Sequence, residues 1–157
     1  MRERTGGAAR LPLVAALVAV ACTVPTTAAY AATTAGGTDT VVALVNQERA
    51  EAGCKPVTVD SRLTTAAQKH SQDQADTGEM THVGSDGSTL GERVTRAGYK
   101  WRKVGENVAM GTTSPEYAMQ MWMNSDAHRK NILNCAFKNI GVGVADGYWT
   151  QDFATPK

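Results

Sequence analysis

Residues 105–133, which read GENVAMGTTSPEYAMQMWMNSDAHRKNIL, are the stretch around which the rest of the chain can be arranged. They begin with a carboxylate and an amide, Glu106 and Asn107, after a glycine that lets the backbone come close. They end in a dense polar segment, residues 125–133, which contains the titratable His128. Polar groups packed this closely between apolar runs favour the wall of a cleft. Helix capping combined with ordinary surface charge explains this stretch alone equally well.

Apolar periodicity and turn residues predict helices before this stretch and strands after it. Residues at helical spacing predict a helix between the cap Asp60 and the stop Gly78, and Asp146-Gly147 is a two-residue hairpin signal. The expected elements are a helix capped by Asp39 that ends before Gly53, an extended link over 56–59, the 60–78 helix, a short helix over 90–97, a strand over 99–104 that runs into 105–107, a helix that starts at Ser114, and strands over 139–145 and 148–154. This order predicts an α+β fold, a three-layer α-β-α sandwich with a central antiparallel sheet.

The first 31 residues have the pattern of an export signal. Three arginines precede an apolar run, Leu11–Ala21, that is too short to span a bilayer. Ala29-Tyr30-Ala31 has the small-x-small pattern of a signal peptidase site, so we expect the secreted chain to begin near Ala32. A competing lipobox-like pattern ends at Cys22 and would make that residue a lipid-anchored N-terminus.

After the signal peptide we expect a flexible segment, residues 32–37, and one domain, residues 38–157. Without residues 1–31 the chain keeps 13 of its 16 Lys+Arg and 14 of its 15 Asp+Glu, a net charge of −1. A near-neutral secreted domain has no broad electrostatic attraction to nucleic acid or anionic lipid. No second apolar run is long enough to cross a membrane, and we expect a monomer.

Two cysteines, Cys54 and Cys135, remain after cleavage. In an oxidising compartment, a pair without CxxC or Cys-His spacing is expected to form one disulfide. The closed loop would contribute about 4 kcal/mol in the chain-entropy model. A catalytic thiol is the poorer interpretation because neither cysteine lies in a basic or glycine-flanked context.

Two further histidines need an interpretation. His70 falls on the apolar stripe of the 60–78 helix, where a hydrogen-bonded core histidine is favoured over a metal ligand. His82 lies in a loop of glycine, serine and aspartate, residues 80–88, and is either a surface residue or part of a site.

With these residues in view, the chain resembles the CAP superfamily (cysteine-rich secretory, antigen 5, PR-1-like) in its bacterial secreted form. The resemblance covers nearly all of the chain after the signal peptide. It rests on the ordered motifs LVNQER (44–49) with Gly53, Leu63–Ala67 leading to His70-Ser71, Thr81-His82, GENVA (105–109), WMNS (122–125), HRKNIL (128–133), IGVGV (140–144) and YWTQDF (148–153).

The resemblance implies an α-β-α sandwich whose cleft collects two histidines and two acidic residues. By motif, His82, Glu106 and His128 match three of these four positions. The fourth, a glutamate in eukaryotic members, falls near Ser125, which is a departure from the family pattern. We expect Asn107 and Ser125 to line the cleft.

Two functions are compatible with this site. Two neutral imidazoles can bind Zn²⁺ or another divalent metal, with Glu106 orienting a histidine or acting as general base in a metal-dependent extracellular hydrolase or protease. The favoured alternative is an extracellular binding or interaction module for a lipid, cell-wall fragment or protein ligand, with or without a metal. In a purely structural alternative, His82 and Glu106 only brace two loops.

Overall fold

A computed structural model describes the backbone of residues 27–157 and the side chains of residues 36–157. The predicted signal peptide and lipobox lie in residues 1–31, almost wholly outside this region, and stay predictions. The elements, in chain order, are helix α1 (Thr27–Glu51), strand β1 (Thr58–Val59), helices α2 (Ser61–Thr77) and α3 (Leu90–Arg96), strand β2 (Trp101–Ala109), helices α4 (Pro115–Met123) and α5 (Asp126–Ile132), and strands β3 (Asn139–Ala145) and β4 (Tyr148–Pro156).

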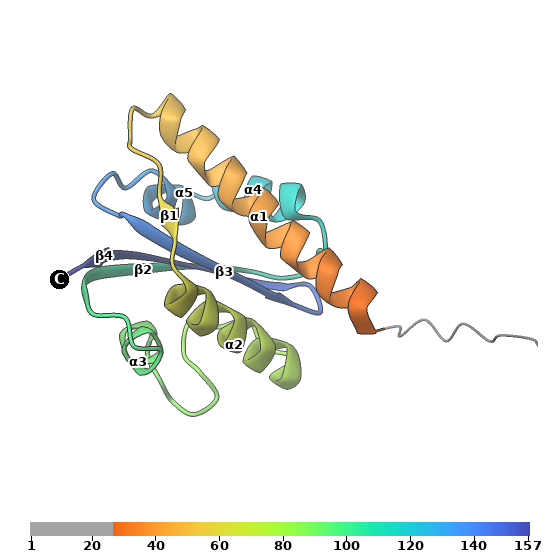
Figure 1. Ribbon diagram of the computed structural model, residues 1–157. Coiled ribbons are helices and arrows are strands. Elements are labelled where there is room, and N and C mark those ends of the chain that lie inside the picture. Colours follow the sequence, from red (N-terminus) through yellow and green to blue (C-terminus); the bar gives the residue numbers. More distant parts are fainter. Residues whose placement is uncertain (1–26) are drawn as a thin grey trace, which may run out of the picture.

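Helices cover both faces of the sheet, which confirms the predicted α-β-α sandwich. Figure 1 shows α1, α4 and α5 on one face and α2 with α3 on the other. Each helix layer has its own apolar cluster against the sheet, the larger one under α1, α4 and α5. No helix of residues 27–157 combines the length and the apolar character that a membrane crossing requires.

The sheet has the order β1-β3-β4-β2 within the described residues. The three long strands are antiparallel, as predicted, and Asp146 and Gly147 form the β3–β4 turn with φ of 45° and 80°. Both residues are thus in the left-handed region that a type I′ hairpin turn requires. Strand β1 differs from the prediction, because it pairs with β3 in parallel through two residues only.

Helix α1 begins earlier than the sequence indicates. Asp39 was the expected cap, yet it lies inside the helix. The helix also includes residues 32–37, whose predicted flexibility stays a prediction. Glycine disfavours helix, and Gly37 lies beside the sheet, where a Cβ would make an ordinary contact of 3.4 Å with the ring of Trp149. This contact with the sheet is a tertiary interaction that the local sequence does not reveal.

The C-terminal end of α1 is anchored by a completely buried arginine. Arg49 makes five hydrogen bonds of 2.8–3.1 Å, all to backbone carbonyls, namely those of Lys55, Ile132, Asn134 and Phe137. Its guanidinium has no carboxylate partner within the described side chains. Arg49 therefore ties α1 to the segment between α5 and β3.

The same two regions are linked covalently. Cys54 and Cys135 form the predicted disulfide, with their Cα atoms 5.0 Å apart and a sequence separation of 81 residues.

Strand β3 lets helix α2 come very close because two of its residues that face the helix are glycines. A Cβ at Gly141 would lie 2.1 Å from the backbone carbon of Leu63, and a Cβ at Gly143 would lie 2.4 Å from Cα of Gln68. Residues two apart on a strand face the same side of the sheet. The two glycines therefore form a seam on which α2 rests.

At this short separation, polar side chains of α2 reach the sheet directly. Ser71 and Gln74 donate to the hydroxyl of Thr150 on β4 at 2.9 and 3.1 Å. All three side chains are buried. Helix α2 is thus held by hydrogen bonds as well as by apolar packing, and His70 lies on the same face.

Candidate functional site

Glu106 is buried in strand β2, and both of its carboxylate oxygens are engaged. Oε1 lies 2.7 Å from Nδ1 of His82, in the loop between α2 and α3. Oε2 accepts a hydrogen bond of 2.5 Å from Arg93 of α3. Nε2 of His70, on α2, lies 3.9 Å from Oε1. Three side chains that are distant in sequence therefore meet at one carboxylate.

Arg93 links this carboxylate to the backbone of the loop. Its second terminal nitrogen donates to the carbonyls of His82 and Ser88 at 3.0 and 2.9 Å. The start of α3 is fixed by a capping box, in which Thr89 and Glu92 bond each other's backbone N–H. The cap fixes the backbone that carries Arg93, and the guanidinium itself is held by its bonds to Glu106, His82 and Ser88.

His82 is held at one ring nitrogen and open at the other. Its side chain is 57% exposed, whereas the Glu106 carboxylate beside it is 2% exposed. A carboxylate that accepts from Nδ1–H orients the ring and leaves Nε2 as an acceptor toward solvent. The loop is anchored on α2, because the backbone and hydroxyl of Ser85 donate to Asp73 at 2.8 and 2.5 Å.

The electrostatics of the cluster favour an ionised Glu106. The hydrogen bond to Glu106 raises the pKa of His82 above its ordinary value. Burial disfavours charge on Glu106, but the hydrogen bond from His82 and the charge of Arg93 outweigh it and lower the pKa of Glu106. Burial lowers the pKa of His70, which is therefore neutral near pH 7.

A second carboxyl group, Asp152, lies opposite Glu106 on strand β4. It is completely buried, and no basic side chain of the described region pairs with it. Burial, and then the negative charge of Glu106, raise the pKa of Asp152 well above its usual range. Of the two carboxyl groups, Glu106 therefore ionises more readily than Asp152.

His128 comes to the same region from helix α5. Its pKa is lowered first by burial and then by the charge of His82. The Asn107 amide donates to the His128 carbonyl at 3.1 Å. The Asn131 amide donates to the Glu106 carbonyl at 3.0 Å and to the Asn107 side chain at 2.9 Å. These bonds fasten α5 to the part of β2 that carries Glu106.

Asn107 and Ser125, the two residues predicted to line the cleft, differ in solvent exposure. Asn107 is completely buried, so it supports the wall and does not line it. Its amide is needed inside, where it satisfies the His128 carbonyl and the side chain of Gln151. Ser125 is half-buried at the N-cap of α5, and its hydroxyl makes no capping hydrogen bond. Of the two, only Ser125 can offer a polar group to a ligand.

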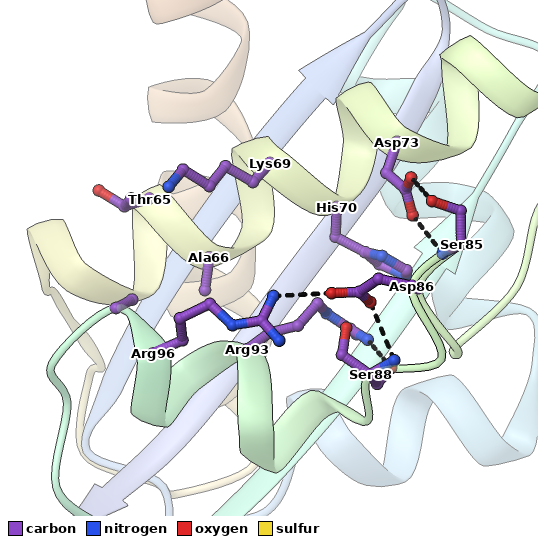
Figure 2. A pocket seen from close by; sticks show the side chains of 12 residues that line it. Thr65, Ala66, Lys69, His70, Asp73, Ser85, Asp86, Ser88, Arg93 and Arg96 are labelled. Atoms are coloured by element: carbon purple, nitrogen blue, oxygen red, sulfur yellow. Dashed lines mark hydrogen bonds and ion pairs between the residues drawn. The ribbon is translucent and has the colours of Figure 1, made fainter.

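A pocket of about 220 Å³ opens between α2, α3 and residues 84–88, and His70 and Arg93 are among its lining residues. Figure 2 shows its rim carboxylates, Asp73 and Asp86, turned toward partners within the protein. His70 is buried, and its Nε2 donates to the carbonyl of Thr81 at 2.8 Å. This confirms the prediction of a hydrogen-bonded core histidine, although the residue also packs beside Glu106.

The number of available ligating side chains limits how a metal ion could bind at this site. Among the residues that the structure describes, no group of three or more His, Cys, Asp or Glu side chains is placed to hold a metal ion. His82 and His128 offer imidazole nitrogens, whereas Glu106 is engaged by His82 and Arg93. The described side chains therefore supply at most two imidazole ligands here, and the rest of any metal shell would have to come from water or a bound molecule.

Two residues of the cluster are missing from the sequence prediction. Asp152 had a usable signal, because a carboxylate in a strand that is otherwise buried needs a special environment. Arg93 had none, since the short 90–97 helix carries a second arginine, Arg96, and the local sequence does not distinguish the two.

Comparison with known proteins gives both a family and a common fold. The model of the cysteine-rich secretory protein family (CAP) matches residues 42–154. The uncharacterized protein YkwD of Bacillus subtilis is 39% identical over 115 residues, which cover 72% of this chain and 45% of that protein. The uncharacterized membrane protein YlbC of the same organism is 30% identical over 113 residues, 72% of this chain and 33% of that protein. The chain thus spans less than half the length of these curated relatives.

Solved structures agree on the fold. An extracellular protein containing a SCP domain from Bacillus anthracis is 33% identical, with a TM-score of 0.75 over 77% of this chain and 41% of that one. An outer surface protein from Borrelia burgdorferi is 17% identical, with a TM-score of 0.71 over 78% of this chain and 94% of that one. At that identity the second likeness concerns the fold alone.

Proposed function

This chain belongs to the cysteine-rich secretory protein family (CAP), and we propose that it is an extracellular binding module whose ligand is met by His82 and His128. The observation that carries the proposal is the complete engagement of buried Glu106, with one oxygen on His82 and the other on Arg93. A carboxylate fixed in this way orients an imidazole. The open Nε2 of His82 is then the group offered to a ligand.

The same engagement speaks against the hydrolase alternative. A general base must accept a proton from a water molecule within hydrogen-bond reach. Glu106 is buried, its pKa is lowered, and a water at either oxygen would have to displace His82 or Arg93. No other observation in the described region favours hydrolysis.

The ligand class follows from the groups at the mouth of the site. Two imidazoles and the Ser125 hydroxyl are hydrogen-bonding groups, which suit an oxygen-rich ligand such as a cell-wall fragment better than an acyl chain. If a divalent ion takes part, His82 and His128 would hold it, and it would attract ligand oxygens as a Lewis acid. With only two protein ligands its affinity would be modest.

An extracellular location is supported by three observations. The Bacillus anthracis relative is described as an extracellular protein. The Cys54–Cys135 disulfide is typical of an oxidising compartment. Residues 1–31 have the pattern of an export signal.

The first experiment measures sedimentation of the purified protein with insoluble cell-wall material, with Zn²⁺ or with a chelator. His82→Ala and His128→Ala should each lower the bound fraction. His70→Gln is the matched control, because it changes a histidine of the same cluster that is not exposed. Equal binding by the wild type and both alanine variants would refute the proposal.

Calorimetric titration with Zn²⁺ at pH 5.5 and 7.5 tests metal binding separately. Because imidazoles must be neutral to coordinate, binding should strengthen as pH rises through about 6.5. Because the pKa of His82 is raised, the increase in Zn²⁺ affinity that comes from deprotonating His82 should occur at a higher pH. Glu106→Gln should weaken binding less than either histidine variant. No binding at pH 7.5 would remove the metal and leave the cleft proposal standing.

A further inference from the structure

Five cationic residues gather at one end of the sheet, although the chain without its predicted signal is nearly neutral. Strand β2 starts there, β4 ends there, and β3 starts beside them, as the position of the C-terminus in Figure 1 shows. We call this region the basic end, and all of its members are exposed: Lys100, Arg102, Lys103, Lys138 and Lys157.

Strand pairing brings these residues together. Trp101 is opposite Pro156, and the backbone N–H of Lys157 donates to the carbonyl of Lys100 at 3.1 Å. The register shifts between Trp101 and Lys103, so Arg102 is an extra residue in a β-bulge.

Lys138 and Lys103 join them through the start of β3. The backbone N–H of Lys138 donates to Ala154 of β4 at 2.9 Å. The ammonium of Lys103 lies 5.5 Å from the centre of the Phe137 ring, next to Lys138 in the chain.

No side-chain carboxylate of the described residues pairs with the basic end. Within the described side chains, none of its five members forms an ion pair. Elsewhere on the surface, Arg62, Arg96 and Arg129 each form an ion pair with an aspartate. Like charges gathered without counter-charges oppose the compact state. The arrangement is accounted for if an anion binds there.

Three of the five cations also share a concave surface. Lys100, Arg102 and Lys157 line a groove of about 520 Å³, and no acidic residue contributes to its wall. Its other lining residues are Thr95, Gly98, Tyr99 and Trp101. The charged side chains that line the groove are therefore all positive.

We propose that this groove binds an extended, phosphate-bearing polymer. A single exposed ion contact contributes little, so stable binding needs several cations to engage one ligand at once. A chain with a phosphate on each repeat can satisfy Lys100, Arg102 and Lys157 together, and it can continue toward Lys103 and Lys138. The proposal concerns residues outside the His82–His128 cleft and does not depend on its function.

Two other anionic partners fit the groove less well. A membrane surface is flat, and none of the large exposed apolar residues, which could insert into lipid, lines the groove. Recognition of nucleic-acid bases uses open aromatic faces. Tyr99 is 2% exposed, and Trp101 is half-buried, with its ring against Gly91. The groove therefore suits the backbone charge of a polymer.

The test is binding of inorganic polyphosphate to the purified protein at 50, 100 and 200 mM NaCl. The groove variant is Lys100→Gln with Lys157→Gln. The matched control is Lys69→Gln with Lys130→Gln, which removes the same charge from two exposed lysines elsewhere. Each phosphate contact adds about one to the slope of log affinity against log salt. The groove variant should lose about two from this slope, and the control should lose none.

Each further outcome decides the matter. Equal loss in the two double variants would show a response to net charge alone and would overturn the groove. Absence of polyphosphate binding at 50 mM NaCl would overturn it as well. If the protein binds anionic phosphatidylglycerol vesicles but not polyphosphate, the surface is a membrane-binding site. If single-stranded DNA binds far more tightly than polyphosphate of equal charge, the groove recognises nucleic-acid bases. His82→Ala should leave polyphosphate binding unchanged.

Discussion

Replacing Arg49 by methionine should be among the most destabilising single changes in this domain. Methionine is long and flexible enough to occupy much of the volume of the arginine stem, so the change mainly removes the guanidinium. Five hydrogen bonds are lost, and the carbonyls of four residues lose a charged donor in a buried or half-buried setting. The wild-type arginine is completely buried, so no water replaces it without rearrangement.

The expected loss is about 4 kcal/mol. A hydrogen bond to a charged group contributes about 1.5–3 kcal/mol, but the cost of burying the guanidinium is recovered in the variant. The sum of five such bonds is therefore an upper bound, and about 1 kcal/mol for each orphaned carbonyl is the better guide. A domain of this size has a total stability of about 5–15 kcal/mol, so the variant would lose a large share of it.

Urea unfolding followed by tryptophan fluorescence measures this change through the midpoint and the slope. The control is Arg62→Met, which removes an arginine that is 49% exposed and paired with Asp60. It should cost no more than about 1 kcal/mol. Arg49→Lys should recover little, because one ammonium cannot reach four carbonyls. A loss below about 1 kcal/mol in Arg49→Met would refute the reasoning.

Three further predictions concern the fold and the site. Reducing the Cys54–Cys135 disulfide should lower the free energy of unfolding by about 4 kcal/mol. Urea unfolding with and without reductant measures this change, and an unchanged midpoint would contradict the prediction. Gly141→Ala should cost about 3 kcal/mol or more because its Cβ has no room, whereas Gly36→Ala, with nothing within 4 Å, should be neutral or stabilising in thermal unfolding. His82 has a raised pKa in the folded state, so its bond to the buried carboxylate stabilises fully below the unfolded pKa of about 6.5 and is lost as pH rises through the folded value. The wild type should therefore exceed His82→Ala in stability by more at pH 5.5 than at pH 8.5, and a constant or reversed difference would show that the bond is absent.

The sequence predicted those parts of the fold that short-range rules determine. Asp60 and Gly78 bound helix α2 because one caps orphan N–H groups and the other adopts the left-handed conformation, and both rules act locally. Asp146-Gly147 predicted the hairpin for the same reason. The start of α1 was wrong because the helix continues through residues that carry no local helix signal, and Gly37 within it lies beside Trp149, more than a hundred positions away.

In the candidate site as well, the sequence predicted residues that belong to local motifs and missed those whose role depends on tertiary packing. His82, Glu106 and His128 were found through motif resemblance, and the structure brings His82 onto Glu106. Arg93 and Asp152 were missed because their roles arise only when α3 and β4 are placed against β2. No spacing within the sequence encodes that placement.

The glycine seam between β3 and α2 has a consequence for the order of folding. Hydrogen bonds from Ser71 and Gln74 to Thr150 are directional and gain nothing until the helix reaches its final distance from the sheet. The β3–β4 hairpin, by contrast, is closed by a two-residue turn and forms contacts of short sequence separation. We therefore expect the hairpin to belong to the folding nucleus and α2 to dock late, so that Thr150→Val mainly speeds unfolding and leaves the refolding rate nearly unchanged in stopped-flow experiments. Slower refolding of that variant would mean that the helix already rests on its seam in the transition state.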